Sequence, residues 1–312
     1  MSSQILSKPF PYIALVVAHL IWGATFVVAK ITLQEFPPSS LAFLRFSLAC
    51  LLLAPFVWAQ RKKISVKKED LPKLLAIGIF IITLNIAFFF EGIVRTTAIN
   101  ASVLTLIIPI SSVLLGWLYL KEKIYLINLL GVLMGLAGAL VIIGLPQIIS
   151  GTYSSETVLG NILIILAALS FVGGAVFSEQ MLKKYSTLTI TAIAFLTGAV
   201  TFFIPAASEY IQNPSWSANI TILGILGLLY MTMLSSISAY FLFEWGLART
   251  NVIRADLFQY IEPFVAAALA VFILAERISL SFMIGASLIA MGVYLGTLAK
   301  EPHHKTRKAH RF

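Results

Sequence analysis

Long runs of predominantly apolar residues set the limits on what this chain can fold into. Residues 12–33 and 159–177 are two examples, and neither run alternates polar with apolar side chains. A membrane-spanning helix needs about 20 such residues, whereas a strand of a membrane β-barrel shows about ten residues that alternate. The runs therefore predict helices that span a membrane.

The composition excludes several classes of protein. Of 312 residues, 59% are apolar and 11% are charged, whereas soluble domains carry about 25% charged residues. Ten spanning helices would use about 200 residues, which leaves room only for short loops and for no sizeable soluble domain. The single cysteine, Cys50, lies in an apolar run, so neither a disulfide framework nor a cysteine-based metal site is expected.

Breaks in the apolar pattern divide the chain into ten predicted spans. The breaks contain turn-forming or charged residues, such as Pro37 and Pro38, the charged run 61–70, and Pro214. The predicted spans are residues 12–33, 39–59, 72–92, 97–119, 125–145, 158–180, 187–207, 219–243, 252–274 and 280–299. The sequence thus predicts an all-α polytopic membrane protein.

The basic residues predict how these spans are oriented. With the N-terminus in the cytoplasm, 18 of the 22 Lys and Arg residues fall on the cytoplasmic side, as the positive-inside rule requires. Both termini are then cytoplasmic, in a cell inner or plasma membrane. The net charge of +9 is explained by this topology near anionic lipid, so no nucleic-acid partner is expected.

A shift of 154 residues aligns two parts of the chain without a gap, residues 84–142 with residues 238–296. The matched pairs include Gly92 with Gly246, Arg95 with Arg249, Pro109 with Pro263, Glu122 with Glu276, Gly131 with Gly285, and Gly138 with Gly292. Shared Leu or Ile could arise by chance in so apolar a chain. Arg, Pro, Glu and three Gly in one register are much harder to obtain by chance, and they indicate an internal repeat.

Each half of the chain holds five predicted spans, and five is an odd number. The second half must therefore enter the membrane from the opposite side. The sequence predicts two inverted repeats, residues 11–145 and 157–299, followed by a basic cytoplasmic tail, residues 300–312. Inverted repeats are typical of secondary transporters, because two equivalent halves can expose one central site to either face in turn.

Motifs in both halves have a familiar form. They are residues 22–26 (WGATF), 44–46 (LRF), 52–55 (LLAP), and two tracts that end in Leu-x-Glu, residues 97–124 and 263–278. These motifs resemble those of EamA-type proteins of the drug/metabolite transporter superfamily, over nearly the whole chain. The resemblance implies ten helices around a central cavity, with helices 3, 4, 8 and 9 lining it and helices 5 and 10 packed behind.

The resemblance also implies a function. Members of this family export amino acids, other metabolites or drug-like cations, often in exchange for protons. Residues 170–173 (SFVG) depart from the aromatic-rich tract of the family pattern, which puts substrate contacts from the sixth helix in doubt.

Two titratable residues within predicted spans are candidates for carrying protons. A charge at mid-membrane costs about 2.5–3.5 kcal/mol on insertion scales, so each one calls for a reason. Glu262 lies about nine residues into the ninth span, before Pro263; a proton-coupling carboxyl and a protonated Glu bonded to a neighbouring helix are equally good interpretations. His19, near Trp22, could titrate or bind a substrate carboxylate, although a neutral His bonded to a backbone carbonyl is the favoured alternative.

Polar residues form a stripe on one face of the fourth span. The stripe contains Ser102, Thr105, Pro109 and Ser112, which share a helical face. The repeat places Asp256, Gln259 and Pro263 on the equivalent face of the ninth span. Such stripes often only pack helices closely, but two of them beside prolines favour a pore lining. Weaker candidates are Asn85, Phe88, Ser238 and Tyr240.

Several charged residues lie near the predicted ends of spans. For Lys30 and Arg45 the favoured interpretation is snorkelling towards the interface, and Glu91, Glu179 and Glu244 are also placed near span ends. Glu122 and Glu276 each open a helix, where a carboxylate meets the positive end of the helix dipole.

The inverted geometry predicts two gating ion pairs. Arg95 and Glu276 fall together at the outer face, and Arg249 and Glu122 fall together at the inner face. Within one repeat, Arg and Glu lie on opposite sides of the membrane and cannot meet. We therefore expect the pairs Arg95–Glu276 and Arg249–Glu122 to link the two repeats.

No catalytic motif or Cys/His cluster is present in the sequence, so no enzyme activity, metal or cofactor is expected. The sequence predicts a proton-coupled secondary transporter that exports small amphipathic metabolites by alternating access, as a monomer or homodimer in the lipid bilayer. Its partners would be protons and a small-molecule substrate. The alternatives are a nucleotide-sugar or sugar-phosphate antiporter and, with less support, a channel or membrane scaffold.

Overall fold

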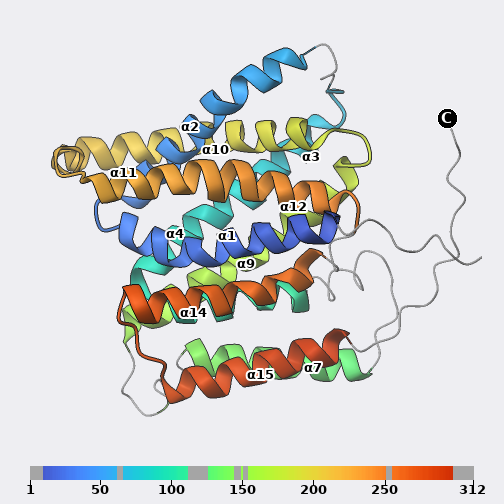
Figure 1. Ribbon diagram of the computed structural model, residues 1–312, viewed down its shortest axis with the longest axis vertical. Helices are drawn as coiled ribbons and strands as arrows, with labels where there is room; N and C mark the ends of the chain where they lie inside the picture. Colours follow the sequence, from blue (N-terminus) through green and yellow to red (C-terminus); the bar gives the residue numbers. More distant parts are fainter. Residues whose placement is uncertain are drawn as a thin grey trace, which may run out of the picture.

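The computed structural model describes residues 10–61, 66–111, 126–143, 149, 154–250 and 255–297. These residues form helices and turns and include no strand. Figure 1 shows the helices lying side by side in roughly parallel and antiparallel directions. This arrangement suits a chain in lipid, where each helix satisfies its own backbone hydrogen bonds because no water is available to do so.

The helices follow the order of the predicted spans. In the first half they are α1 (Phe10–Thr32), α2 (Pro38–Ala59), α3 (Leu71–Ile77), η1 (Gly78–Leu84), α4 (Asn85–Arg95), α5 (Ala98–Leu104) and α7 (Leu126–Ile143). In the second half they are α9 (Ser155–Met181), α10 (Thr187–Gln212), η2 (Pro214–Ala218), α11 (Ile222–Leu229), η3 (Tyr230–Ser238), α12 (Ala239–Leu247), η4 (Leu257–Tyr260), α14 (Ile261–Ile273) and α15 (Leu280–Thr297).

Six of these helical rods are long and apolar enough to cross a membrane. They begin at Phe10, Pro38, Leu71, Ser155, Thr187 and Ile222 and contain 22–27 residues each. Four shorter apolar helices occupy the places of the predicted fourth, fifth, ninth and tenth spans. The prediction of an all-α polytopic membrane protein is confirmed, and the count of ten spans stays a prediction.

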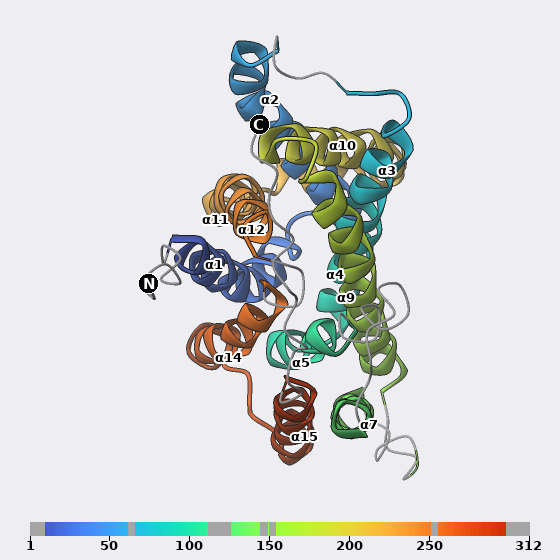
Figure 2. The ribbon, with the colours of Figure 1, turned by 90° about the vertical axis from the view of Figure 1, so that its right-hand side faces the viewer.

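The two halves pack on one another through corresponding helices. α2 packs against α10, α5 against α14, and α7 against α15, and in each case the two helices hold the same place in their repeats. Figure 2 shows α7 and α15 side by side at one edge of the molecule. This pattern is expected of two inverted repeats related by a pseudo-two-fold axis, because only elements near the axis meet their own counterparts.

Glycines bring α7 and α15 into close contact. A Cβ atom on Gly138 would lie 2.5 Å from the carbonyl oxygen of Gly285, and one on Gly292 would lie 2.5 Å from that of Gly131. The shift of 154 residues converts the first of these pairs into the second. Small residues allow membrane helices to approach closely enough for their backbones to touch, so the four glycines set this symmetric crossing.

A π-helical segment interrupts the third helix of each half. η1 joins α3 to α4, and η3 joins α11 to α12. Residues 232–238 of η3 are the repeat counterparts of residues 78–84, which form η1. π-helical turns within α-helices are rare and occur frequently at functional sites. Because both halves contain such a segment at the same position, the middle of these two helices is where the side chains change direction relative to a regular α-helix.

Carboxylates of one half bind the starts of helices in the other half, at the ends predicted to face outwards. Glu209 accepts from the backbone N–H groups of Ser39 (3.0 Å) and Ser40 (2.7 Å) at the start of α2. Glu35 accepts from the backbone N–H and hydroxyl of Thr221, the N-cap of α11, both at 2.7 Å. Each carboxylate therefore satisfies donors that the helix itself leaves free.

A third acidic residue, Asp70, links the halves at the start of α3, which is predicted to face the cytoplasm. Asp70 accepts from Lys184 Nζ (2.7 Å) and from the hydroxyl of Tyr185 (2.8 Å). These hydrogen bonds lower the pKa of the Asp70 carboxyl. Links of this kind hold the two halves together at both ends of the bundle.

We expect Gly138→Ala to destabilise the protein by about 1–3 kcal/mol, the usual cost of overpacking, because its new Cβ would meet the Gly285 backbone. Thermal unfolding of the purified protein in detergent measures the effect. Gly173→Ala is the matched control, since a Cβ there would lie 3.6 Å from the Phe80 ring, an ordinary contact. Equal melting temperatures for the two variants would contradict the role given to the glycine crossing.

The Glu35 cap is expected to depend on pH. Hydrogen bonds from Thr221 lower the pKa of the Glu35 carboxyl. A depressed pKa contributes stability that is present above the unfolded value, about 4.3 for Glu, and is lost as pH falls through the folded value. The wild type should therefore melt above Glu35→Gln at neutral pH, with a difference that vanishes in acid. A difference that is independent of pH would refute this role for the charge.

Candidate functional site

A cavity of about 90 Å³ lies at the centre of the helical bundle. A single water molecule needs about 10–15 Å³ measured in this way, so the cavity has room for several waters or a small ligand. Its polar lining residues are Thr25, Arg45, Asn85, Thr105, Ser235, Gln259 and Glu262. Its aromatic lining residues are Trp22, Phe26, Phe89, Phe171 and Tyr240.

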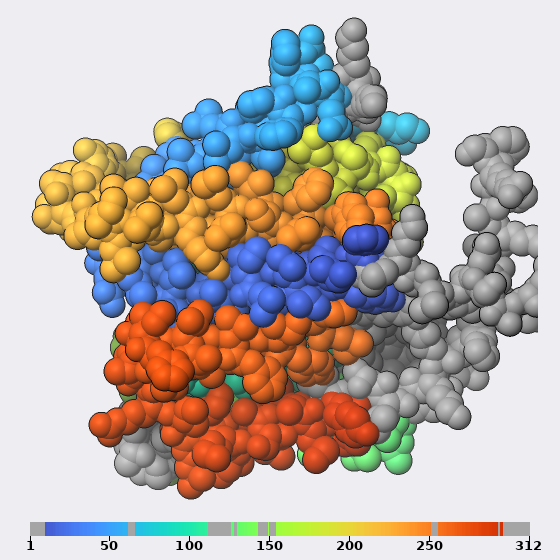
Figure 3. All heavy atoms as spheres, in the orientation of Figure 1, coloured from blue at the N-terminus to red at the C-terminus, as the bar shows by residue number. Residues whose placement is uncertain are grey.

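The cavity is built by more helices than the family resemblance implies. α4, the end of the α5 span, η3 with α12, and α14 all contribute, as expected for helices 3, 4, 8 and 9. α1 and α9 add Trp22 and Phe171, so the sixth helix does supply an aromatic side chain. Figure 3 shows α1 (blue) on one face of the molecule between the orange residues of α12 and α14, with which it packs.

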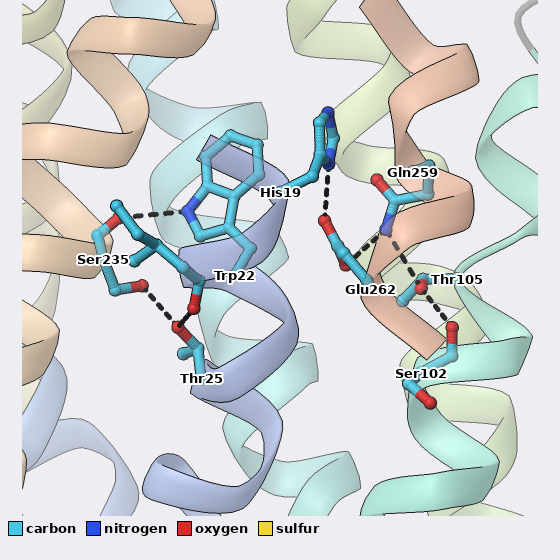
Figure 4. A network of polar contacts seen from close by, with 9 residues as sticks. His19, Trp22, Thr25, Ser102, Thr105, Ser235, Gln259 and Glu262 are labelled. Atoms are coloured by element: carbon cyan, nitrogen blue, oxygen red, sulfur yellow. Dashed lines mark hydrogen bonds and ion pairs between the residues drawn. The ribbon is translucent and has the colours of Figure 1, made fainter. Parts of the chain in front are cut away.

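A buried contact joins α1 to α14 beside this cavity, which Glu262 lines. His19 Nδ1 lies 2.7 Å from Glu262 Oε1, and Figure 4 shows the two side chains pointing at one another. The exposed fractions of His19 and Glu262 are 0% and 3%. An imidazole and a carboxyl group in hydrogen-bond contact and shielded from water form the kind of pair across which a proton can pass.

The carboxylate of Glu262 has a second partner that lies on the symmetry axis. The side-chain amide of Gln259 donates to Glu262 Oε2 and to Thr105 Oγ1, the latter at 3.2 Å. Thr105 and Gln259 are 154 residues apart, the length of the repeat shift, so each is the counterpart of the other. Residues that contact their own counterpart lie on the pseudo-two-fold axis, and the His19–Glu262 pair is therefore near the centre of the molecule.

Trp22 is held firmly by its surroundings. Its indole N–H donates to the backbone oxygen of Ser235 at 3.0 Å, and the hydroxyls of Thr25 and Ser235 are 3.0 Å apart (Figure 4). The Trp22 ring contacts Tyr240 and Phe171, with ring centroids 5.1 and 5.8 Å apart. These rings form a rigid apolar wall beside the polar groups, which suits an amphipathic ligand.

Arg45 does not snorkel, and that prediction is wrong. Its exposed fraction is 1%, and its guanidinium donates to the hydroxyls of Ser236 (2.6 Å) and Ser235 (3.1 Å) on η3. α2 packs against η3, so the side chain finds partners inside the bundle and does not reach an interface. The contact between α2 and η3 reveals these partners of Arg45. The one sign of them in the sequence is the pair of adjacent serines, Ser235 and Ser236, within an apolar span.

Lys30 reaches a different place. Its ammonium group donates to the backbone oxygens of Ile93 and Thr96, where α4 ends. Free carbonyls at a helix C-terminus attract cations. Arg45 is therefore the only cation among the described residues that line the cavity.

Only some residues of the predicted polar stripes on the fourth and ninth spans line the cavity. Thr105, Gln259 and Glu262 line it, whereas Ser102 is buried and donates to the backbone oxygen of Ile99 at 2.8 Å. Pro109 is buried, Pro263 is half-buried, and Asp256 is buried without lining the cavity. Ser112 lies outside the described residues.

The weaker candidates divide in the same way. Asn85 lines the cavity and donates to the backbone oxygen of Ala167 at 2.9 Å, and Tyr240 also lines it. Phe89 lines it in place of Phe88, because helical spacing turns the neighbouring ring away. Ser238 does not line the cavity and donates to the backbone oxygen of Met233. The serine of the eighth span that lines the cavity is Ser235.

The ion pair predicted between Arg95 and Glu276 is not among those formed by the described residues. Arg95 pairs with Glu91, one turn earlier on α4, and with Glu156 (3.3 Å). Glu276 accepts from the backbone N–H groups of Ala98 (2.8 Å) and Ile99 (3.0 Å). The carboxylate does cross between repeats, as predicted, but it caps α5, because free backbone donors there compete with the arginine.

The second predicted pair cannot be followed, since Glu122 lies outside the described residues. Arg249 donates to the backbone oxygen of Trp245 at 3.0 Å and stacks over its ring. Glu244 lies near the end of its helix, as predicted; it is 3% exposed and accepts from the Ser178 hydroxyl at 2.6 Å. Among the described residues, no group of three or more His, Cys, Asp or Glu side chains could hold a metal ion.

Comparison with known proteins places these features in a family. The model of the EamA-like transporter family matches residues 9–144 and 158–298. A protein of Archaeoglobus fulgidus called an uncharacterized transporter is 32% identical, over 92% of this chain and 96% of its own. The uncharacterized transporter YoaV of Bacillus subtilis is 26% identical, over 89% and 93% of the two chains.

More distant proteins agree with this picture. A WAT1-related protein of Arabidopsis thaliana is 26% identical, over 94% of this chain and 83% of its own. A solved crystal structure with 20% identity aligns over 94% of this chain and 98% of its own, with a TM-score of 0.64. At that identity the likeness concerns the fold alone.

We expect Glu276→Gln to destabilise the protein by about 0.5–2 kcal/mol, as loss of a helix cap does, because an NH2 donor replaces one of the two oxygens that accept from Ala98 and Ile99. Arg95→Gln is the control for the alternative pairing, and it should cost less because Arg95 binds exposed Glu91 and Glu156. Thermal unfolding in detergent compares the two. A larger loss for Arg95→Gln would reverse our assignment of the Glu276 contact.

Proposed function

Because the chain belongs to the EamA-like transporter family, we propose that it exchanges protons for a small amphipathic metabolite by alternating access. Its relatives are named as transporters, which indicates a transporter and not an enzyme. The finer parts of the proposal rest on the cavity. They are the coupling to protons, the export direction, and a substrate of the amino-acid or drug-like cation class.

The observation that carries the proposal is the buried contact between His19 and Glu262, of which Glu262 lines the cavity. Placing an ionisable side chain within the membrane costs free energy, so such a residue is a candidate for a function in transport. Glu262 lines the cavity while its two oxygens accept from His19 and Gln259. The carboxyl is thus within reach of both a proton carrier and a bound ligand.

Competition at Glu262 would couple the two fluxes. A buried carboxylate needs a positive partner, and either a proton or the cationic group of a substrate can supply it. Binding of one then disfavours binding of the other, because a neutral carboxyl no longer attracts a cation. Loss of a proton from the Glu262–His19 pair to the solution on one side would leave the carboxylate able to bind the cationic group of the substrate, and uptake of a proton from the other side would expel the substrate.

The symmetric framework supports alternating access. The cavity lies on the pseudo-two-fold axis, where an inverted repeat can open it to either face. η1 and η3 lie within the two rods that flank the cavity, and π-helical turns are places where a helix can bend. We propose that α7 and α15 form a scaffold, that residues 11–145 and 157–299 move as the two repeats, and that both termini face the cytoplasm.

Reconstitution in liposomes tests proton coupling. Radiolabelled amino acids and lipophilic cations are first screened for uptake driven by a pH gradient. Glu262→Gln should then lower the gradient-driven rate about 10- to 150-fold, which corresponds to loss of a hydrogen bond to a charged group of about 1.5–3 kcal/mol. Exchange of labelled for unlabelled substrate without a gradient should fall less than the gradient-driven rate, because the cavity keeps its other lining residues and only the contact with Glu262 is weakened.

Glu244→Gln is the matched control, since Glu244 is also a buried acid but does not line the cavity. Its gradient-driven flux should stay close to that of the wild type. Proton movement is followed in the same liposomes with an entrapped pH-sensitive dye. Substrate flux without proton flux in the wild type, or an unchanged rate in Glu262→Gln, would contradict the proposal.

A further inference from the structure

Arg45 presents unused hydrogen-bond donors at the wall of the cavity. Its Nε donates to Ser236 and its Nη2 to Ser235, while Nη1 makes no hydrogen bond to the described residues. A guanidinium has five N–H donors, and the two serines use two of them. Three donors of a fully buried side chain remain for a ligand.

No described residue supplies a countercharge to the guanidinium. The ion pairs of the described residues involve other cations, and none includes Arg45. Its carbon Cζ lies 5.1 Å from the centroid of the Phe46 ring, which offers only a weak attraction. Arginine stays protonated in proteins, and a buried charge that has only neutral partners is costly. An anion that entered the cavity would relieve that cost.

We propose that Arg45 binds the carboxylate group of the transported substrate. Arginine donates two parallel N–H bonds to a carboxylate, and Nη1 with the second proton of Nη2 supplies such a pair. Ser235 and Ser236 hold the guanidinium in place without neutralising it. The identity of the bound molecule as a transported substrate rests on the proposed function, whereas the binding itself does not.

The charge balance of the cavity favours a carboxylate over a phosphate. Arg45 is the only cation among the described lining residues, and Lys30 is engaged at the end of α4. A phosphate with two negative charges would leave one of them unpaired and would face Glu262, which lines the same cavity. One anionic group at Arg45 and one cationic group at Glu262 match an amphoteric molecule with an apolar body.

A purely structural role makes a different prediction. In that case Arg45 would serve only to join α2 to η3 through the two serines. Its removal would then lower stability and weaken every ligand alike. Carboxylate binding, in contrast, makes the loss selective for ligands that carry the negative charge.

Calorimetry of the purified protein in detergent separates the two roles. The probes are 4-methylpentanoate, phenylacetate, their uncharged primary amides, and inorganic phosphate. The wild type should bind at least one carboxylate about tenfold or more tightly than its amide, the least that a charge-assisted hydrogen bond contributes. Arg45→Gln should bind the carboxylate and the amide equally, and Arg45→Lys should keep part of the preference.

Ser236→Ala is the matched control, because it removes one hydrogen bond of the guanidinium and keeps the charge. It should retain a preference for carboxylates, reduced because the guanidinium is held less firmly, and Arg45→Lys keeps the proposal testable if Arg45→Gln does not fold. Absence of binding by both carboxylates, tighter binding of phosphate, or the same preference in Arg45→Gln would overturn the proposal. These equilibrium measurements need no pH gradient, so their failure is distinguishable from failure of proton coupling at Glu262.

Discussion

The packing of corresponding helices against one another is the constraint on which the rest of this structure depends. α2 meets α10, α5 meets α14, and α7 meets α15, so a pseudo-two-fold axis passes between the halves. In lipid, helices do not associate to escape water, and close van der Waals packing of small residues is needed instead. The glycines of α7 and α15 supply it. The cavity, the π-helical segments and the polar network are all arranged about that axis.

Chemistry at the centre requires departures from this symmetry. Glu262 is the repeat counterpart of Ile108, and Gln259 is the counterpart of Thr105; all four line the cavity. Duplication therefore provides two equivalent surfaces, and substitution in the second half provides an acid and an amide. His19 comes from α1 to meet that acid. Two equivalent halves can open a central cavity to either face of the membrane. Polar groups that only one half supplies, such as Glu262 and Gln259, can bind a ligand in one orientation.

Errors of the sequence-based prediction arise where partners compete. Arg45 was expected at an interface, yet two serines on η3 hold it inside the bundle. Glu276 was expected to pair with Arg95, yet the free backbone donors of α5 hold it. The place predicted for Arg45 was therefore wrong, and Glu276, expected to open the last helix, lies before α15 begins at Leu280 and caps α5. Hydropathy describes where a residue lies along the membrane, but it carries no information about which neighbour faces it.

The sequence by itself determined the helical membrane fold, the two repeats and the family, because apolar run length and the 154-residue register are properties of the chain alone. It also singled out His19 and Glu262, since titratable groups in apolar runs are rare. Only the tertiary structure decided that these two side chains meet, that Thr105 contacts Gln259 on the axis, and that Arg45 lines the cavity. Those contacts join residues up to 243 positions apart, and they depend on the rotation of each helix about its own axis, which packing sets.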